Sequence, residues 1–341
     1  SVLSDKSVKL EKIHQFTIGE TKEVYIGLVY KVKFWRGKIV ILDYVQPLLV
    51  FIDPSDGRVV RSIKFKSGKG PGEVLQIESF DLTSDRIYLF DRYNLRFSVF
   101  DLYGNYIRSS PWSKNSDFLI AGDFIIVGDK MYIKAIESKY HNDTERYKSR
   151  VIAILDTSFN VLKAFGVMDE IYRLFKVYLT GANFCFDSLG NLYYTQEATY
   201  RIYKYDRGNN LVKVFGVRGN FKLINEDINP FAPLTELMKI GAKYSWSSGL
   251  AYLHQDRGYI LYFYNNPTPE FYRTRDFMKI NYFLKVYDTD GNCIGGDIRL
   301  PGMFLTLGDK GELYILESDE PNNRKVGVYR LRIVDKNFLR F

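Results

Sequence analysis

Short hydrophobic runs alternate with polar turns along the whole chain, and five of these turns share one pattern. In each copy an aspartate ends a hydrophobic run, a short turn with glycine or asparagine follows, and a second hydrophobic run begins. The copies are FIDPSDGRVV (51–60), FDLYGNYI (100–107), LDTSFNVL (155–162), YDRGNNLVKV (205–214) and YDTDGNCI (287–294). Asp, Asn and Gly tolerate the positive φ values of tight turns, so each copy predicts a β-hairpin.

A second set of polar turns lies between these copies, and each is followed by a strand with a hydrophobic period of two. This set comprises WRGKIVILD (35–43), LTSDRIYLFD (82–91), VGDKMYIKA (127–135), DSLGNLYYT (187–195) and DKGELYILE (309–317). Together the two sets predict a repeating unit of four antiparallel strands, which is the blade of a β-propeller. The aspartates of the first set recur after 48, 55, 50 and 82 residues, as expected of an array built from one supersecondary unit.

Counting these units predicts an all-β protein with one six-bladed β-propeller domain over residues 1–341. The predicted blades span approximately 28–66, 76–114, 119–167, 179–217, 244–300 and 301–341. The last blade has only three strands of its own, and the N-terminal segment 8–18 can supply the fourth. Pairing the two ends of the chain would close the ring and protect its edges. Two segments outside the repeat, 168–178 and 233–241, have the pattern of short helices.

Composition supports strands and argues against a nucleic-acid reader. Among the 341 residues are 27 Tyr and 25 Phe, which favour pleated and half-buried surfaces. The net charge of +8 comes from 48 basic and 40 acidic residues spread along the chain. Nucleic-acid-binding proteins usually gather basic residues into a patch and carry a motif, and neither is present here.

The two cysteines and the sequence termini carry little functional information. Cys185 lies in an apolar strand and Cys293 follows a turn, so two free thiols are expected rather than a disulfide, and no Cys/His spacing predicts a metal site. No stretch approaches the roughly 18 apolar residues that span a bilayer. The chain begins without Met or a signal peptide, which is typical of a trimmed mature form.

All the long insertions in the repeat are predicted to lie on one face of the propeller. The turns between strands one and two, and between strands three and four, are short. The long segments connect strands two and three, or successive blades: 137–150, 221–246, 264–281 and 318–325. Long loops on a rigid scaffold are where binding and catalysis concentrate, so this face is the predicted functional surface.

Aromatic and basic side chains on these loops are the predicted ligand-binding residues. Aromatic rings beside arginines suit stacking on sugars or peptide groups and pairing with carboxylates. The candidates are Arg92, Tyr93, Arg96, His141, Tyr200, Arg201, Trp246, Tyr272, Arg273 and Arg275. A loop aromatic can equally well pack only against its own loop.

No motif in the chain specifies a reaction. The glycine-rich string GKGPGE (68–73) is followed by a strand-like segment rather than a helix, so it predicts a crossover between blades and not a phosphate loop. DTDGN (288–292) and DPSDG (53–57) lack the glutamate that completes a calcium loop. The three histidines show no metal-ligand spacing, and no nucleophile elbow is present.

With the blades defined, the chain resembles an uncharacterised family of exported bacterial six-bladed β-propellers, many of them lipoproteins. The resemblance covers essentially the whole chain and depends on GKGPGE after the first blade, the FDxxGN hairpins, the GNLYY-type second strands and the N-terminal VKL strand. It implies export, with a periplasmic location or a lipid anchor upstream of this sequence. The family supplies no substrate and no catalytic residues.

Two functions remain open at this point. The preferred one is a non-catalytic binding module that holds a glycan, a peptide or a partner protein on the long-loop face, with no cofactor. The alternative is a metal-dependent hydrolase, similar to lactonases and esterases, with calcium at the mouth of the central channel. Such enzymes need Glu, Asn and Asp converging from inner strands, and the candidates here are Glu78, Asp123, Asn183 and Asp187.

Overall fold

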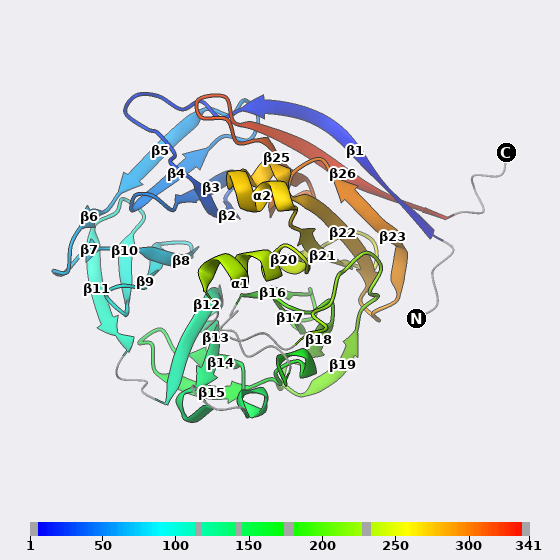
Figure 1. The fold of residues 1–341 in the computed structure, drawn as a ribbon. Helices are drawn as coiled ribbons and strands as arrows, with labels where there is room; N and C mark the ends of the chain where they lie inside the picture. The colour runs from blue at the N-terminus through cyan, green and yellow to red at the C-terminus, as the bar shows by residue number, and fades with distance from the viewer. Residues whose placement is uncertain (1–5, 113–116, 141–144, 174–180, 227–232, 336–341) are drawn as a thin grey trace.

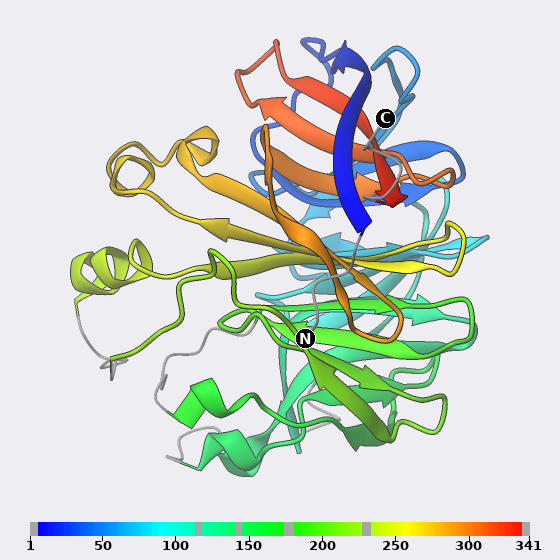
Figure 2. The same ribbon diagram turned by 90° about the vertical axis from the view of Figure 1, so that its right-hand side faces the viewer.

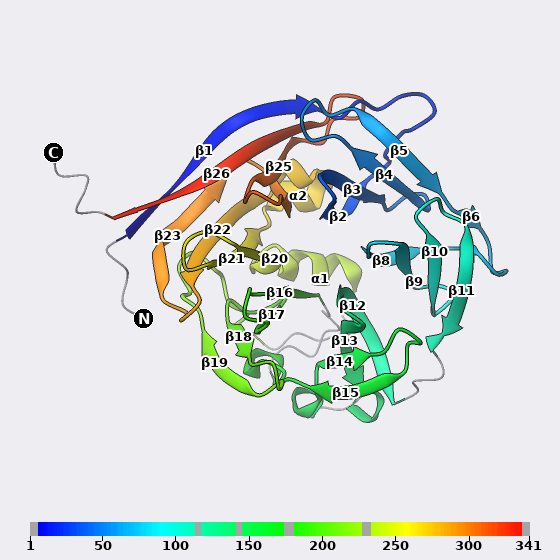
Figure 3. The same cartoon turned by 180° about the vertical axis from the view of Figure 1, so that it is seen from behind.

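Six four-stranded antiparallel sheets stand radially around a central channel (Figures 1 and 3). This computed structural model describes residues 6–112, 117–140, 145–173, 181–226 and 233–335. The predicted fold class, an all-β six-bladed propeller, is confirmed.

The blades follow one another along the chain, each beginning with its innermost strand. Blades I and II contain β2 (Val29–Trp35), β3 (Lys38–Asp43), β4 (Leu48–Ile52), β5 (Val59–Lys64), β8 (Ile77–Leu82), β9 (Arg86–Asp91), β10 (Arg96–Asp101) and β11 (Tyr106–Pro111). Blades III and IV contain β12 (Phe118–Val127), β13 (Lys130–Glu137), β14 (Ile152–Leu155), β15 (Val161–Phe165), β16 (Ala182–Phe186), β17 (Leu192–Gln196), β18 (Ile202–Tyr205) and β19 (Leu211–Phe215). Blades V and VI contain β20 (Trp246–Leu253), β21 (Tyr259–Asn266), β22 (Asn281–Asp288), β23 (Cys293–Leu300), β24 (Met303–Leu307), β25 (Leu313–Ser318), β26 (Lys325–Asp335) and β1 (Lys6–Thr17).

The N-terminal strand closes the ring, as the sequence predicts. β1 pairs antiparallel with β26 from Lys6 opposite Asp335 to Thr17 opposite Lys325, and the sheet order is β1-β26-β25-β24. The first strand and the last strand of the described chain therefore both belong to blade VI (Figure 1). The closure leaves no blade with a missing strand and covers the edge of β26.

Four of the five aspartate turns of the first set share one hydrogen-bond pattern, and the turn at Asp53 is the exception. In the turn after β10, one carboxylate oxygen of Asp101 accepts from the backbone N–H groups of Tyr103 and Asn105, at 2.8 and 2.9 Å. The Asn105 side-chain amide donates to the other oxygen at 2.8 Å. The same Asp-x-x-x-Asn arrangement recurs at Asp156, Asp187, Asp206 and Asp288. These turns are local structure, and their carboxylates are already used.

Each gap between neighbouring blades is filled by its own hydrophobic cluster, six in all. The second and third strands of a blade are therefore covered on both faces. This explains why IVILD in β3 and LLVFI in β4 are fully buried and read as continuous apolar runs. The outer strand β5 alternates instead, since only one of its faces packs against the protein.

The long connections lie on one face and the short hairpins on the other (Figure 2). The long-loop face carries η2 (Ser138–Tyr140), η3 (Arg146–Lys148), η4 (Glu170–Arg173), α1 (Leu234–Gly241), α2 (Pro269–Thr274) and η5 (Phe277–Lys279). The helix predicted over 233–241 is confirmed by α1. Of the helix predicted over 168–178, the described part forms only the 3-10 turn η4, and 174–178 lies outside the described residues. α2 was not predicted.

Two smaller predictions also hold. GKGPGE is a crossover between blades I and II, bracketed by the short parallel strands β6 (Lys66–Ser67) and β7 (Glu73–Val74). Gly68 and Gly72 there have φ values of 150° and 75°, which other residues rarely adopt. Cys185 and Cys293 are both buried and free.

None of the helices in the described ranges is long and apolar enough to cross a membrane.

Candidate functional site

The innermost strands of the propeller enclose a cavity of about 630 Å³ along the central axis, which we call the channel. β2, β12, β16, β20 and β24 contribute most of its lining. A volume of this size lies in the range of pockets that hold small organic ligands. Because it lies on the axis where the inner strands of most blades meet, we take the channel as the candidate site.

One wall of the channel carries an ion pair between blades I and III. Lys31 Nζ lies 2.5 Å from Asp123 Oδ2, and the Ser79 hydroxyl donates to Asp123 Oδ1 at 2.6 Å. Burial alone would raise the pKa of Asp123, but the positive charges of Lys31 and Lys33 and these hydrogen bonds outweigh it, and the pKa is lowered. Asp123 is thus a paired carboxylate and not an open ligand position.

The second channel lysine is held much more loosely. Lys33 Nζ lies 3.7 Å from Asp81 Oδ1, which is beyond hydrogen-bond distance. Asp81 meanwhile accepts from two backbone N–H groups, those of Leu82 at 3.0 Å and Ile126 at 2.7 Å. The ammonium of Lys33 makes no hydrogen bond with any described residue, and it borders the channel.

Three aromatic rings of the lining are each held in place by a second ring behind them. Phe304 stacks on Phe263 with centroids 3.6 Å apart, and Phe34 stacks on Tyr314 at 5.6 Å. Phe184 lies against Tyr194 in a tilted arrangement, with centroids 5.3 Å apart. The three lining rings are only half-buried, so each presents apolar surface to the channel. Rings fixed in this way bind ligands with little loss of conformational entropy.

The excursion between β21 and β22 lies across the end of the channel on the long-loop face. In Figure 1 α1 lies over the centre of the ring and α2 lies inside the ring above it, and Figure 2 shows both on the same side. Phe277, Ile280 and Tyr282 line the channel at this end, and the Tyr282 hydroxyl donates to the Phe277 carbonyl at 2.9 Å. Thr268 caps α2 by accepting from the Phe271 N–H. The long-loop face and the channel thus form one continuous surface.

The predicted residues of blade II lie beside the channel rather than in it. Arg92 pairs with Glu78 at 3.3 Å, and Tyr93 is mostly exposed. Arg96 donates to the backbone carbonyls of Lys69, Gly70 and Glu73, so its guanidinium fixes the GKGPGE crossover. This last contact gives Arg96 a structural role that the sequence did not predict.

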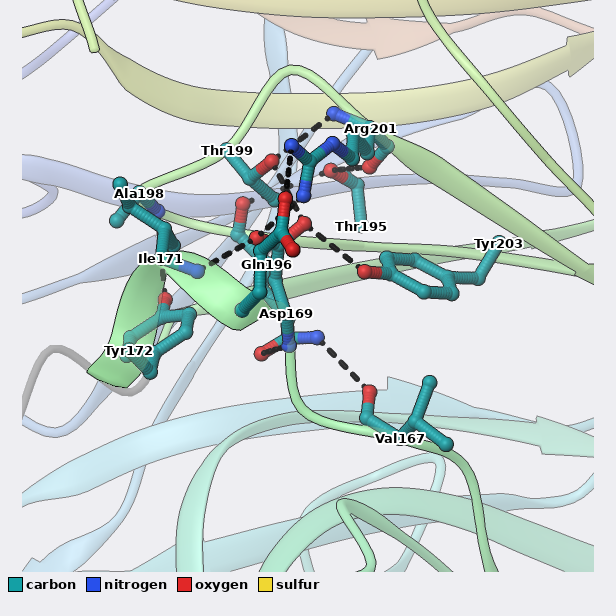
Figure 4. Close-up of polar contacts among 11 residues, drawn as sticks. Val167, Asp169, Ile171, Tyr172, Thr195, Gln196, Ala198, Thr199, Arg201 and Tyr203 are labelled. Atoms are coloured by element: carbon teal, nitrogen blue, oxygen red, sulfur yellow. Dashed lines mark hydrogen bonds and ion pairs between the residues drawn. The ribbon is translucent and has the colours of Figure 1, made fainter. Parts of the chain in front are cut away.

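Arg201 belongs to a buried polar cluster around Asp169 (Figure 4). The Asp169 carboxylate accepts from Arg201 at 3.1 Å, from the hydroxyls of Thr199 and Tyr203 at 2.9 Å each, and from the Ile171 N–H at 2.9 Å. Its side chain is 1% exposed. The cluster joins η4 to the strands of blade IV, and it positions Arg201 at the base of the long-loop face.

The remaining candidates lie around the helical excursions. Tyr200 packs against Phe221 at 6.0 Å, and the Trp246 indole N–H donates to the Gly241 carbonyl at the end of α1. The other three come from α2 and its cap: Tyr272 is half-buried, Arg273 is exposed, and Arg275 lies over the Tyr272 ring. His141 lies outside the described residues. None of the nine described candidates lines the channel, and their contact with a ligand stays a prediction.

The four residues that a metal-dependent hydrolase would need do not converge. Asp187 accepts from Leu189 and Asn191 in its own hairpin turn, on the face opposite the long loops. Asp123 is paired with Lys31, and Asn183 donates to Ser247 between blades IV and V. Glu78 accepts from the Tyr30 hydroxyl and pairs with Arg92. Among the described residues no three His, Cys, Asp or Glu side chains could hold a metal ion. Four residues in separate contacts, one of them paired with a lysine, do not form a donor set that fits calcium.

Lys31, Lys33 and Asn265, which all border the channel, were not among the predicted residues. The signal for the two lysines was present in YKVKFW (30–35). An inner strand of a propeller has little solvent on either face, so two alternating lysines there must meet a carboxylate or the channel. Asn265 gave no comparable signal.

Six blades around a lined channel, with long loops on one face, define the protein as a six-bladed β-propeller. The chain belongs to the family DUF5128, described as "6-bladed beta-propeller", which matches residues 5–227. The resemblance found in the sequence is thereby confirmed. The comparison with curated proteins finds no match.

Among solved structures, a member of the DUF4221 family from Bacteroides vulgatus superposes with a TM-score of 0.74 at 13% identity, covering 96% of this chain and 99% of that one. A Bacteroides fragilis protein named "Putative exported protein" gives 0.59 at 12% identity, covering 96% and 95%. The calcium-binding protein regucalcin from Agrobacterium tumefaciens gives 0.50 at 12% identity, covering 92% and 95%. At these identities the likeness shows a shared fold.

The Lys31–Asp123 pair gives the site a pH dependence. Because the folded-state pKa of Asp123 is lowered, the pair stabilises the protein above the unfolded pKa of about 4 and is lost as pH falls through the folded value. Asp123→Asn is expected to cost about 1–2 kcal/mol near neutral pH, since both side chains are partly exposed. Urea unfolding should show this difference shrinking below about pH 4. An equal difference at every pH would show that Asp123 is not ionised in the folded protein.

Proposed function

We propose that the protein is a non-catalytic ligand-binding propeller that takes its ligand into the channel from the long-loop face. The observation that carries this proposal is the lining of the 630 Å³ cavity: fixed aromatic rings beside polar groups, with Asp123 paired to Lys31 and the nearby Asp81 accepting from two backbone N–H groups. Such a lining supports holding a molecule. It offers no acid–base pair or open cation site for a reaction.

The mixed lining also favours one kind of occupant over another. A channel of this volume accommodates a small molecule or the end of a larger one, such as the terminus of a peptide or glycan. The aromatic and basic residues of the long-loop face, including Tyr200, Arg201, Tyr272 and Arg275, would then contact the part of a larger ligand that stays outside.

A channel-blocking substitution tests this proposal. Ser248 lies in β20 and is exposed at the channel lining. A larger side chain at this position would extend into the cavity and fill part of it. We expect wild type to bind the neutral apolar probe N-phenylnaphthylamine saturably, one per chain. Ser248→Trp should weaken this binding at least about tenfold because the indole occupies the same volume. Fluorescence titration measures both.

The matched control is Ser62→Trp, since Ser62 lies exposed on the outer strand β5. It adds the same ring to the surface and should leave probe binding unchanged. Equal binding by wild type and both variants would place the probe outside the channel and contradict the proposal. Thermal unfolding of the two variants establishes that each is folded.

The proposal includes export from the cytoplasm. Its support is the family resemblance together with the shared fold of the B. fragilis protein named as exported. Fractionation of the source cells with an antibody against this chain tests it. Recovery in the membrane or periplasmic fraction is expected, and recovery with cytosolic markers would refute export.

A further inference from the structure

The channel contains spare hydrogen-bond donors but no spare carboxylate. Lys33 has three N–H donors and none reaches a described acceptor, its nearest one being Asp81 at 3.7 Å. Asp81 is occupied by two backbone N–H groups, and Asp123 by Lys31 and Ser79. A cation entering the channel would find both of these carboxylates already engaged, whereas an anion would find an ammonium without a hydrogen bond.

The position of Lys33 sets how an anion would lie. β2 begins on the long-loop face at Val29, so Lys33 is four residues into the channel, roughly 13 Å along the strand. Phe184 is the third residue of β16 and Phe304 the second of β24, so both lining rings are fewer residues from the long-loop end of their strands than Lys33 is. A ligand would therefore place its charged end inward and its apolar body toward the mouth.

A second polar group near the mouth is also without a partner. Asn265 is the next-to-last residue of β21, at the long-loop face, and it borders the channel. Its Oδ1 atom is buried and makes no hydrogen bond. Buried polar atoms are normally satisfied, so this acceptor calls for a donor that the described chain does not supply.

From these observations we propose that the channel binds an amphiphilic organic anion, with its anionic group on Lys33 and its apolar body against the aromatic rings. A hydrogen-bond donor on the body, such as an amide N–H, would meet Asn265. A free organic acid and the carboxyl terminus of a peptide share this chemistry. This inference rests on the proposed function and adds the chemical class of the ligand.

A pair of probes with one ring skeleton tests the charge. Anilinonaphthalene sulfonate is anionic and N-phenylnaphthylamine is its neutral counterpart. We expect Lys33→Met, which keeps the apolar stem, to weaken binding of the anionic probe about tenfold or more and to leave the neutral probe within about twofold. Lys33→Arg keeps the charge and should retain most of the affinity for the anionic probe. The matched control is Lys64→Met on the exposed face of β5.

Displacement from wild type gives a second test that needs no variant. N-acetyltryptophan, which mimics a peptide terminus, should displace the anionic probe, and N-acetyltryptophanamide should not. Displacement by phenylbutyrate as well would indicate a free acid site, and displacement by the tryptophan derivative alone would indicate a peptide terminus.

The outcomes separate the two proposals. In one outcome the neutral probe binds and Ser248→Trp blocks it, but Lys33→Met binds the anionic probe as tightly as wild type and N-acetyltryptophanamide displaces it as well as N-acetyltryptophan does. The channel then binds ligands without recognising charge, and only this inference fails. If neither probe binds wild type, both proposals are overturned. Loss of both probes in a folded Lys33→Met protein would also refute the inference, because Lys33 would then maintain the channel rather than recognise an anion.

Discussion

Replacing Arg324 with methionine is expected to lower the free energy of unfolding by about 3–5 kcal/mol, the usual cost of removing one partner of a buried ion pair. Arg324 and Glu20 are 1% and 0% exposed, and their side chains meet at 2.7 Å. Arg324 also pairs with Asp319 at 2.6 Å, and Glu20 accepts from the Ile26 N–H at 2.8 Å. The substitution leaves the Glu20 carboxylate buried without its counter-charge, at the segment where the chain passes from β1 to blade I.

Arg332→Met is the matched control, because Arg332 lies in β26, the strand that begins directly after Arg324. Arg332 pairs with Glu11 across β26 and β1, but both side chains are exposed, at 64% and 43%. Such a pair contributes about 1 kcal/mol or less. Urea denaturation of both variants makes the comparison, and adding Glu20→Gln to Arg324→Met should recover part of the loss. Equal, small losses would show that the buried pair does not secure the ring closure.

The fold could be predicted from sequence because both the turns and the buried strands of the blades repeat along the chain as recognisable sequence patterns. Asp-x-x-x-Asn turns such as 101–105 are satisfied within five residues, so they are visible without knowledge of the tertiary structure. The buried middle strands produce continuous apolar runs. The closure by β1 followed from counting strands, since one blade was a strand short. In the described part of the chain, α2 and the segment 168–173, which forms only a 3-10 turn, departed from these local rules.

The candidate site was harder to predict because it is made by distant parts of the chain. Lys31 and Asp123 are 92 residues apart, and nothing local to either indicates the other. Loop arginines were predicted to bind ligand since their exposure was assumed, whereas Arg96 and Arg201 bind the chain itself. A long loop shows which face is variable. It does not show which of its polar groups the fold has already used.

Removing the carboxylate at the centre of Figure 4 is the second substitution expected to have a large effect. Asp169→Ala should lower the free energy of unfolding by about 3–5 kcal/mol, since it leaves several buried donors without an acceptor and removes one of the two carboxylates that pair with Arg201. Arg201 and Tyr203 would lose their ion pair and hydrogen bond, and the N–H of Ile171 would lose the contact that begins η4. Denaturant unfolding measures the change.

Glu170→Ala is the control for this cluster, because Glu170 also pairs with Arg201, at 2.6 Å, yet is 68% exposed. Its loss should cost about 1 kcal/mol or less. A large difference between the two variants would mean that Arg201 is held by Asp169 and is presented to the long-loop face in a fixed position. Similar small losses would mean that Asp169 does not hold Arg201 in place, and Arg201 would then have to reorient to contact a ligand.

Because Asp169 lies outside the channel lining, Asp169→Ala should still bind N-phenylnaphthylamine at temperatures where it remains folded. Stability and channel binding are therefore separable in this propeller.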